Sequence, residues 1–207
     1  QPLNQIIMNH YQILIIGGGN AGLSVASQLL LKNKNLQIGI VEPSEKHYYQ
    51  PAWTLVGAGA FDIAKTEKKE ADYIPQNTTW IKEAVATFSP EKNTVTCTNG
   101  TEITYDYLVV CPGIQLDWKK IDGLTETLGK NEVSSNYSFN TAPYTWELIK
   151  NFKGGNAVFT QPTTPIKCGG APKKVMYLTN SRLNEAKARA NAELTFYADS
   201  GKLFGVK

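Results

Sequence analysis

The chain has 207 residues, of which 42% are hydrophobic, 10% aromatic and 19% charged, and it contains 17 glycines. This composition can form a hydrophobic core, which excludes a wholly disordered chain, and the length predicts one domain or one and a half. The net charge of +3 is too small to indicate a nucleic-acid partner. No apolar run approaches the roughly 20 residues that cross a bilayer.

The few cysteines and histidines argue against a metal centre. The sequence has three cysteines, no C-x-x-C pair and two histidines, so we predict neither a metal site nor a disulfide framework. We expect Cys97, in a strand, and Cys111, before a glycine turn, to be small packing residues.

A strand, a glycine-rich loop, a helix and a second strand follow one another near the N-terminus. Tyr11–Ile16 and Gln37–Val41 are short, β-branched apolar runs that are typical of buried parallel strands. Between them, Leu23 to about Lys32 carries apolar residues at helical spacing. The segment therefore predicts a βαβ unit of an α/β, Rossmann-like fold.

The loop in this unit has the spacing G-x-G-x-x-G, and an acidic residue ends the second strand. The first glycine permits a tight turn, the second lets the backbone approach a pyrophosphate, and the third allows close packing of the helix. The acid, about 20 residues further on, can accept hydrogen bonds from the adenosine ribose. We predict a dinucleotide site formed by Gly17, Gly18, Gly19, Asn20, Ala21, Gly22 and Glu42.

An antiparallel excursion, at about residues 79–104, interrupts the Rossmann-like domain. We expect loops and short helices over Ser44–Pro75, with Lys65–Glu70 as a solvated charged segment. Strand patterns then follow closely, and Asn99-Gly100 predicts a type I′ hairpin. The predicted strands are Thr79–Lys82, Ala84–Phe88, Thr94–Thr98, Thr101–Thr104 and the central strand Tyr107–Val110.

The excursion and the strand that ends near Gly113 favour FAD over NAD. They resemble the second fingerprint of flavoproteins with two dinucleotide-binding domains, although Cys111-Pro112-Gly113 replaces the commoner Ala-Thr-Gly. That resemblance places Gly113 in the FAD site and implies that the backbone at Val85 contacts adenine.

A second βαβ unit begins after a connector at Ile114–Asn140. Thr141 can cap a helix, which Gly154-Gly155 ends, and the last three elements are predicted at Asn156–Thr160, Ala171 to about Ala190, and Ala192–Tyr197. We predict an FAD-binding domain at 10–125 and the incomplete start of a second, NAD-like domain at 140–207. On this interpretation the chain is the N-terminal part of a larger protein.

The loop of the second unit carries a cysteine in place of a second glycine fingerprint. Gln161–Pro172 contains three prolines, which remove N–H donors that a pyrophosphate would need. Cys168 stands just before the predicted helix, where the helix dipole, Lys167 and the Lys173-Lys174 pair favour a thiolate. A nucleophilic thiolate here indicates redox chemistry at sulfur.

Four longer motifs resemble the mitochondrial-type (type II) sulfide:quinone oxidoreductases. They are Val41–Gly59 (VEPSEKHYYQPAWTLVGAG), Tyr107–Val110 with Gly113–Asp117, Ser135–Ser138 (SNYS), and Pro165–Lys174 (PIKCGGAPKK). The resemblance implies FAD as cofactor, hydrogen sulfide as substrate, a quinone as electron acceptor and a small sulfur acceptor. It implies docking on a membrane surface, either the cytoplasmic face of a bacterial inner membrane or the mitochondrial inner membrane.

The same resemblance assigns roles to two residues. Cys168 matches the first of two catalytic cysteines and would carry a persulfide, and Gln50 matches a glutamine that contacts the flavin. Neither Cys97 nor Cys111 matches the second cysteine, which we expect beyond Lys207, so we expect this stretch alone to be inactive. Two alternatives stay open, an NAD(P)H-dependent flavoprotein reductase and a non-catalytic FAD-binding module.

Overall fold

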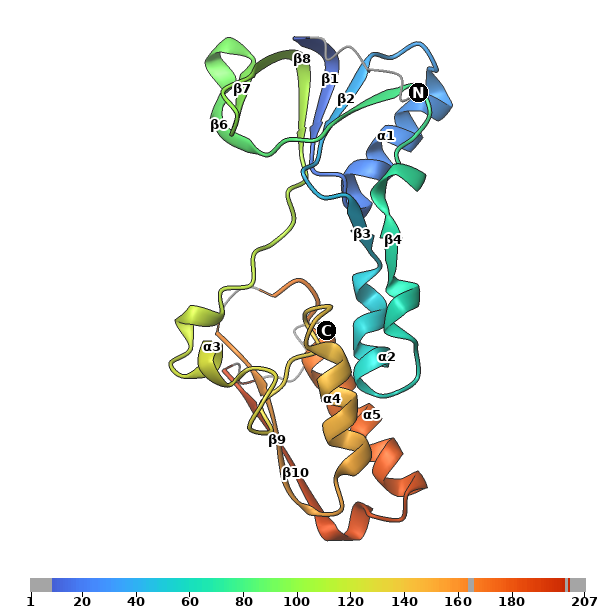
Figure 1. The fold of residues 1–207 in the computed structure, drawn as a ribbon, viewed down its shortest axis with the longest axis vertical. Helices are drawn as coiled ribbons and strands as arrows, with labels where there is room; N and C mark the ends of the chain where they lie inside the picture. The colour runs from blue at the N-terminus through green and yellow to red at the C-terminus, as the bar shows by residue number, and fades with distance from the viewer. Residues whose placement is uncertain (1–8, 164–165, 200, 202–207) are drawn as a thin grey trace. The chain divides into compact units, whose positions relative to one another are not determined.

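The computed structural model (Figure 1) describes residues 9–163, 166–199 and 201. The chain forms two compact units, which we describe separately. The first comprises the chain up to Tyr48 together with Glu67–Gln115, and the second comprises Tyr49–Thr66 and the chain from Leu116 onward. The domains predicted from the sequence, 10–125 and 140–207, differ from these units mainly at residues 49–66, which group with the second unit.

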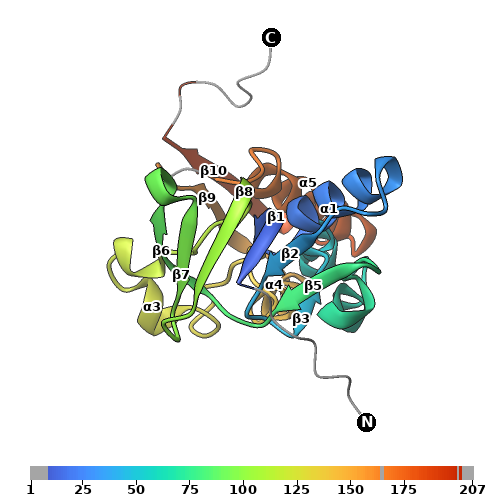
Figure 2. The same cartoon turned by 90° about the horizontal axis from the view of Figure 1, so that it is seen from above.

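A six-stranded mixed sheet forms the centre of the first unit, in the order β5-β2-β1-β8-β7-β6 (Figure 2). The first four strands in this order are parallel to one another, whereas β7 is antiparallel to both β8 and β6. The α/β fold and the antiparallel excursion predicted from the sequence are thereby confirmed. The strands are β1 (His10–Ile16), β2 (Ile38–Val41), β5 (Thr78–Ile81), β6 (Val85–Ser89), β7 (Thr94–Cys97) and β8 (Glu102–Val110).

Helix α1 (Asn20–Lys32) connects β1 to β2 and covers one face of the sheet. It begins three residues earlier than the apolar pattern predicts, because Asn20 and Ala21 already belong to its first turn. Its buried face packs on alternate residues of β1 and β2, in a cluster of Leu23, Ala26, Leu30, Ile13, Ile15, Ile38 and Ile40. This alternation is the side-chain period of a β-strand.

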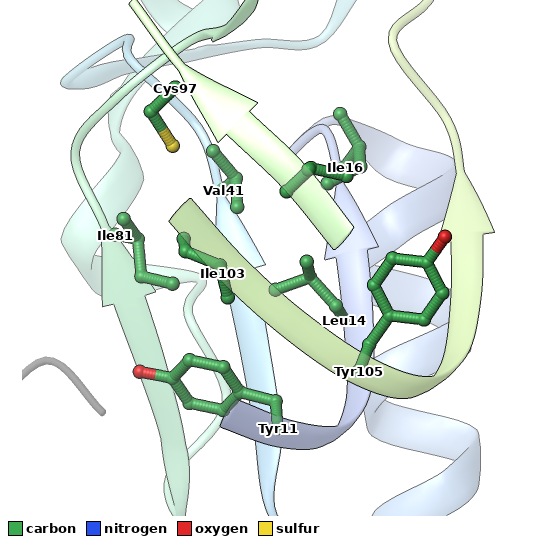
Figure 3. Packing of buried hydrophobic residues seen from close by; sticks show 9 residues of the cluster. Tyr11, Leu14, Ile16, Val41, Ile81, Cys97, Ile103 and Tyr105 are labelled. Carbon is green, nitrogen blue, oxygen red and sulfur yellow. The ribbon is translucent and has the colours of Figure 1, made fainter. Parts of the chain in front are cut away.

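The opposite face of the sheet is covered by the antiparallel strands. Leu14 and Ile16 of β1 point to this side, where Tyr11 lies against Ile81 and Ile103 (Figure 3). Cys97 is 2% exposed within the same cluster, which confirms its expected packing role. Both faces of the parallel strands are therefore buried, as their continuous apolar sequences predict.

Two sequence predictions about the excursion need correction. Strand β8 is continuous from Glu102 to Val110, so the two strands predicted on either side of Tyr105-Asp106 are one. Its first half pairs with β7 and its second half continues along β1. The hairpin at Asn99-Gly100 exists, but the prediction of a type I′ turn is wrong. That turn requires a positive φ at both central residues, and only Gly100 has one, of +85°.

The charged segment Lys65–Glu70 is not simply solvated. Residues of this segment form β4 (Glu67–Lys69), which pairs antiparallel with β3 (Lys46–Tyr48). Thr66 is fully buried and Glu70 is 2% exposed. The prediction of a solvated segment is wrong at these two positions, which lie directly before and directly after β4.

A βαβ unit and two helices form the core of the second unit. Strands β9 (Gly155–Gln161) and β10 (Ala192–Ala198) pair in parallel and are joined by α5 (Ala171–Glu185). Helix α5 ends five residues before the predicted end, near Ala190. The other helices are α2 (Trp53–Gly57), α3 (Leu124–Thr127) and α4 (Ala142–Asn151).

Contacts between α2 and its neighbours explain why residues 49–66 belong to this unit. Gly59 lies against the indole of Trp146 in α4, so closely that a Cβ atom would be 2.4 Å from the ring. Arg182 of α5 donates a hydrogen bond from Nε to the carbonyl of Ala58, at 2.9 Å. Thr141 precedes α4 as expected, but its hydroxyl bonds to Ser135 and Ser138 and does not cap the helix.

Among the described residues, every helix is too short or too polar to cross a membrane.

Candidate dinucleotide site and cysteine site

The glycine loop connects the end of β1 to the start of α1 in a conformation that requires glycine. Gly17 has a φ of +103°, and its N–H donates to the carbonyl of Val41 at 2.8 Å. A Cβ atom on Gly17 would lie 2.2 Å from the carbonyl oxygen of Cys111, and one on Gly22 would lie 1.9 Å from that of Gly17. Both glycines therefore permit close backbone packing, as the fingerprint predicts.

The middle of the loop is open in contrast. Gly19, Asn20 and Ala21 are exposed at the N-terminus of α1, and no side chain caps this end of the helix. A Cβ atom on Gly19 would have no protein atom within 4 Å. Unsatisfied N–H groups and the positive end of a helix dipole favour a phosphate group here, so these residues fit a dinucleotide pyrophosphate.

Glu42 is held next to the loop by backbone N–H groups. Its Oε2 accepts a hydrogen bond from Gly18 at 2.8 Å and its Oε1 accepts one from Ser44 at 2.7 Å. The indole of Trp80 also donates to the Glu42 carbonyl at 2.8 Å. The carboxylate is thus fixed at the end of β2, and its remaining lone pairs suit the hydroxyls of a ribose.

The end of β8 lies beside the same loop. The N–H of Cys111 donates to the carbonyl of Ile16 at 2.7 Å, and Gly113 follows with a φ of +73°. Val85, at the start of β6, packs against the cluster that contains Ile16. In doubly wound sheets, ligands bind at the carboxyl ends of such neighbouring parallel strands. Gly113 and Val85 therefore stay candidates for the same dinucleotide site.

A buried acidic residue behind this loop was missed by sequence reasoning. Glu70 begins a 3₁₀ turn (Glu70–Asp72) after β4, and its Oε2 lies 3.0 Å from Nδ1 of His47 in β3. Burial raises the pKa of Glu70, the neighbouring Glu42 raises it further, and His47 opposes the rise. The available signal was weak, since Glu70 stands at the end of an otherwise exposed charged segment.

Cys168 occupies the loop between β9 and α5 in the second unit. Its side chain is exposed, and it stands two residues before Gly170, the N-cap residue of α5. Its carbonyl accepts hydrogen bonds from the Tyr137 hydroxyl at 3.0 Å and from the Ala171 N–H at 3.1 Å. The loop backbone is therefore fixed while the thiol stays accessible. Part of the predicted loop, Thr164 and Pro165, lies outside the described residues.

Two lysines and a tyrosine lie in or beside this cysteine loop. Lys173 is 4% exposed and donates to the Gly169 carbonyl at 3.2 Å and to Oε1 of Gln161 at 2.8 Å. Lys167 donates to Oε1 of Gln50, which places the predicted flavin-contacting glutamine in the same unit as Cys168. Burial lowers the pKa of Lys167, an effect that Cys168 opposes, and burial raises the pKa of Tyr137.

Comparisons with known proteins agree with this geometry. Residues 11–144 match the family described as pyridine nucleotide-disulphide oxidoreductase. Two curated relatives are named mitochondrial sulfide:quinone oxidoreductase. The one from Dictyostelium discoideum is 51% identical over 97% of this chain and 45% of its own length, and the one from Mus musculus is 43% identical over 96% and 44%. The chain therefore spans about half the length of these relatives.

A solved structure supports the fold. The sulfide:quinone oxidoreductase from Aquifex aeolicus aligns with 92% of this chain and 43% of its own chain, with a TM-score of 0.68 and 24% sequence identity. This likeness and the family match confirm the Rossmann-like fold predicted from the sequence. The family match and the curated relatives confirm the predicted FAD cofactor. The chain belongs to the pyridine nucleotide-disulphide oxidoreductase family.

Proposed function

We propose that this protein is a flavoprotein that oxidises hydrogen sulfide and passes the electrons through FAD to a quinone. Two mitochondrial sulfide:quinone oxidoreductases that are 43% and 51% identical to this chain support the proposal. The observation that carries it is the exposed Cys168 at the start of α5, in the loop where a nucleotide-binding glycine fingerprint is expected. That position suits a sulfur nucleophile better than a second dinucleotide.

In this proposal the two domains predicted from the sequence have different tasks. Residues 10–125 bind FAD, through Gly17–Gly22, Glu42, Val85 and Gly113, and residues 140–207 begin a second domain that presents Cys168. Gln50 contacts the flavin and is oriented by its hydrogen bond from Lys167. Tyr137 and Lys173 hold the backbone that follows the Cys168 side chain, by donating to the carbonyls of Cys168 and Gly169.

The proposed chemistry at Cys168 is the formation of a persulfide. Joining a sulfide anion to the Cys168 thiolate forms one S–S bond and releases one proton and two electrons. The glycine loop and Glu42 would hold FAD, which would supply the acceptor for this electron pair and the link to the quinone. A small nucleophile then removes the outer sulfur and regenerates Cys168. The mitochondrial names of the relatives favour the inner mitochondrial membrane over a bacterial membrane as the surface on which this reaction occurs.

The proposal is tested by reducing the bound flavin with sulfide under anaerobic conditions. In the full-length protein, Cys168→Ser is expected to retain FAD, because the glycine loop is unchanged, but to lose nearly all sulfide-dependent reduction of the flavin and of quinone. Cys97→Ala is the matched control, since Cys97 is a buried packing residue of the first unit. Near wild-type turnover by Cys168→Ser would overturn the assignment.

The same assay separates the main alternative function. An NAD(P)H-dependent reductase would bleach its flavin rapidly and stoichiometrically with NADH or NADPH. We expect neither nucleotide at millimolar concentration to reduce the flavin at an appreciable rate. Pro162, in the loop between β9 and α5, and Pro172, in the first turn of α5, have no N–H group to donate to a pyrophosphate. Rapid reduction by NADH together with inertness toward sulfide would replace the sulfide proposal with the reductase.

A further inference from the structure

A second carboxylate, that of Glu70, lies next to the glycine loop. Glu70 is not among the residues that the sequence predicts for the dinucleotide site. Glu70 is 2% exposed, and its Oε2 pairs with Nδ1 of His47 at 3.0 Å. The His47 ring is in turn stacked on Tyr73, with ring centroids 4.9 Å apart. The second oxygen, Oε1, is buried and has no hydrogen-bond partner among the described residues. A buried carboxylate oxygen without a partner is costly and calls for a functional explanation.

The position of this oxygen provides one. The Oε1 atom of Glu70 lies 2.6 Å from the point that a Cβ atom on Gly18 would occupy, and Cγ and Cβ of Glu42 lie 2.7 and 2.8 Å from the same point. Two acidic side chains therefore meet on the same side of the Cα atom of Gly18. One of them, Glu42, accepts the Gly18 N–H, and the other packs against the loop from behind.

We propose that Glu70 is a positioning residue of the FAD site, and that a proton bound by the Glu70–His47 pair controls the affinity of the glycine loop for FAD. The inference rests on the proposed FAD site in the first unit and does not depend on the chemistry at Cys168. Glu70 acts through Gly18 and Glu42, because its own oxygens are shielded from a ligand.

The sign of the effect follows from charge. The pyrophosphate of FAD is anionic, and each proton lost from the Glu70–His47 pair makes the buried region behind the loop more negative by one charge. FAD should therefore bind more weakly as the pH rises, and binding should take up protons. The groups around Glu70 are His47 from β3, Glu42 from the end of β2, and Tyr73 on its own segment. Burial and Glu42 raise the pKa of Glu70, which brings its titration closer to neutral pH.

The test is the pH dependence of FAD release from the holoprotein. Diluted samples are equilibrated at pH values from 4.5, the ordinary pKa of the glutamate side chain, upward to about 8, and the fluorescence of free FAD gives the dissociation constant. For the wild type we expect the constant to increase with pH, by at most about tenfold per pH unit, which is the limit for one linked proton. Glu70→Gln, which preserves the shape of the side chain, should remove this dependence. His47→Gln, which leaves Glu70 without its partner, should shift the increase to higher pH.

A neighbouring carboxylate provides the control. Glu67 lies on β4, where it accepts hydrogen bonds from Lys46 and Tyr48, and Glu67→Gln should retain the wild-type profile. If Glu70→Gln weakens FAD binding by the same factor at every pH, or keeps the wild-type slope, the proposal is wrong and Glu70 is only a packing residue. If the wild type binds no FAD, the proposed FAD site fails, and this inference fails with it.

Discussion

A Cβ atom on Gly22 would lie only 1.9 Å from the carbonyl oxygen of Gly17, whereas one on Gly19 would meet no protein atom within 4 Å. The two glycines belong to the same loop, yet they are required for different reasons. Gly22 allows α1 to approach the end of β1, which is a matter of folding. Gly19 leaves space beside the helix N-terminus, which is a matter of ligand binding.

This contrast predicts opposite phenotypes for two alanine substitutions. Gly22→Ala should lower the free energy of unfolding by at least about 2 kcal/mol, because backbone atoms must move to relieve the contact. Gly19→Ala should leave the urea midpoint of the flavin-free protein nearly unchanged but reduce the FAD bound per protein, measured from absorbance near 450 nm. Equal FAD content in wild type and Gly19→Ala would show that the pyrophosphate does not lie there.

Glu42 combines a structural and a binding role, so its substitution should affect both. Glu42→Ala leaves the N–H groups of Gly18 and Ser44 without their acceptor and removes the proposed ribose partner. We expect a loss of about 1–3 kcal/mol in the free energy of unfolding and a lower FAD occupancy. Glu45→Ala is the control, since Glu45 forms an exposed ion pair with Lys82, and it should change neither quantity measurably.

The parallel strands and the glycine loop could be predicted from the sequence because their signals are local. The apolar run that became β1, the G-x-G-x-x-G spacing and the acid at the end of β2 lie within about 35 residues, and each has a specific steric or electrostatic reason. The position of Cys168 just before α5 could be predicted for the same reason, since the prolines and glycines around it mark the loop that precedes the helix.

The position of Glu70 could not be predicted, because it depends on pairing between distant segments. Its burial follows from the pairing of β3 with β4, in which Lys46 lies opposite Lys69, and from the proximity of Gly18. None of these relationships leaves a periodic pattern in so short a charged segment. The turn at Asn99-Gly100 was mistaken for a related reason, since a dipeptide favours a hairpin but does not determine the φ of each residue.

The buried position of Glu70 also predicts a pH dependence of stability. Its pKa is raised from the ordinary value of 4.5 in the folded state, so the folded chain binds this proton more tightly than the unfolded chain does. Its contribution to the free energy of unfolding should therefore decrease as the pH rises from 4.5 through the raised pKa. Urea midpoints of the flavin-free wild type and of Glu70→Gln should diverge accordingly, with the wild type losing relative stability as the pH rises. Parallel curves over this range would contradict the prediction.

The three cysteines differ in exposure, and this difference predicts their order of reaction with iodoacetamide. Cys168 is exposed, Cys111 is half-buried and Cys97 is 2% exposed in the core between the sheet and the excursion. Burial raises the pKa of Cys97, and the charge of Glu83 raises it further, so its thiolate is scarce as well as shielded. In the native protein Cys168 should be alkylated first, and Cys97 should react only when the core opens. Mass spectrometry of peptides sampled over time would measure the three rates, and the same experiment in urea should bring them close together. If Cys97 reacts before Cys168 in the native protein, then Cys168 is not the accessible nucleophile that the proposed persulfide chemistry requires.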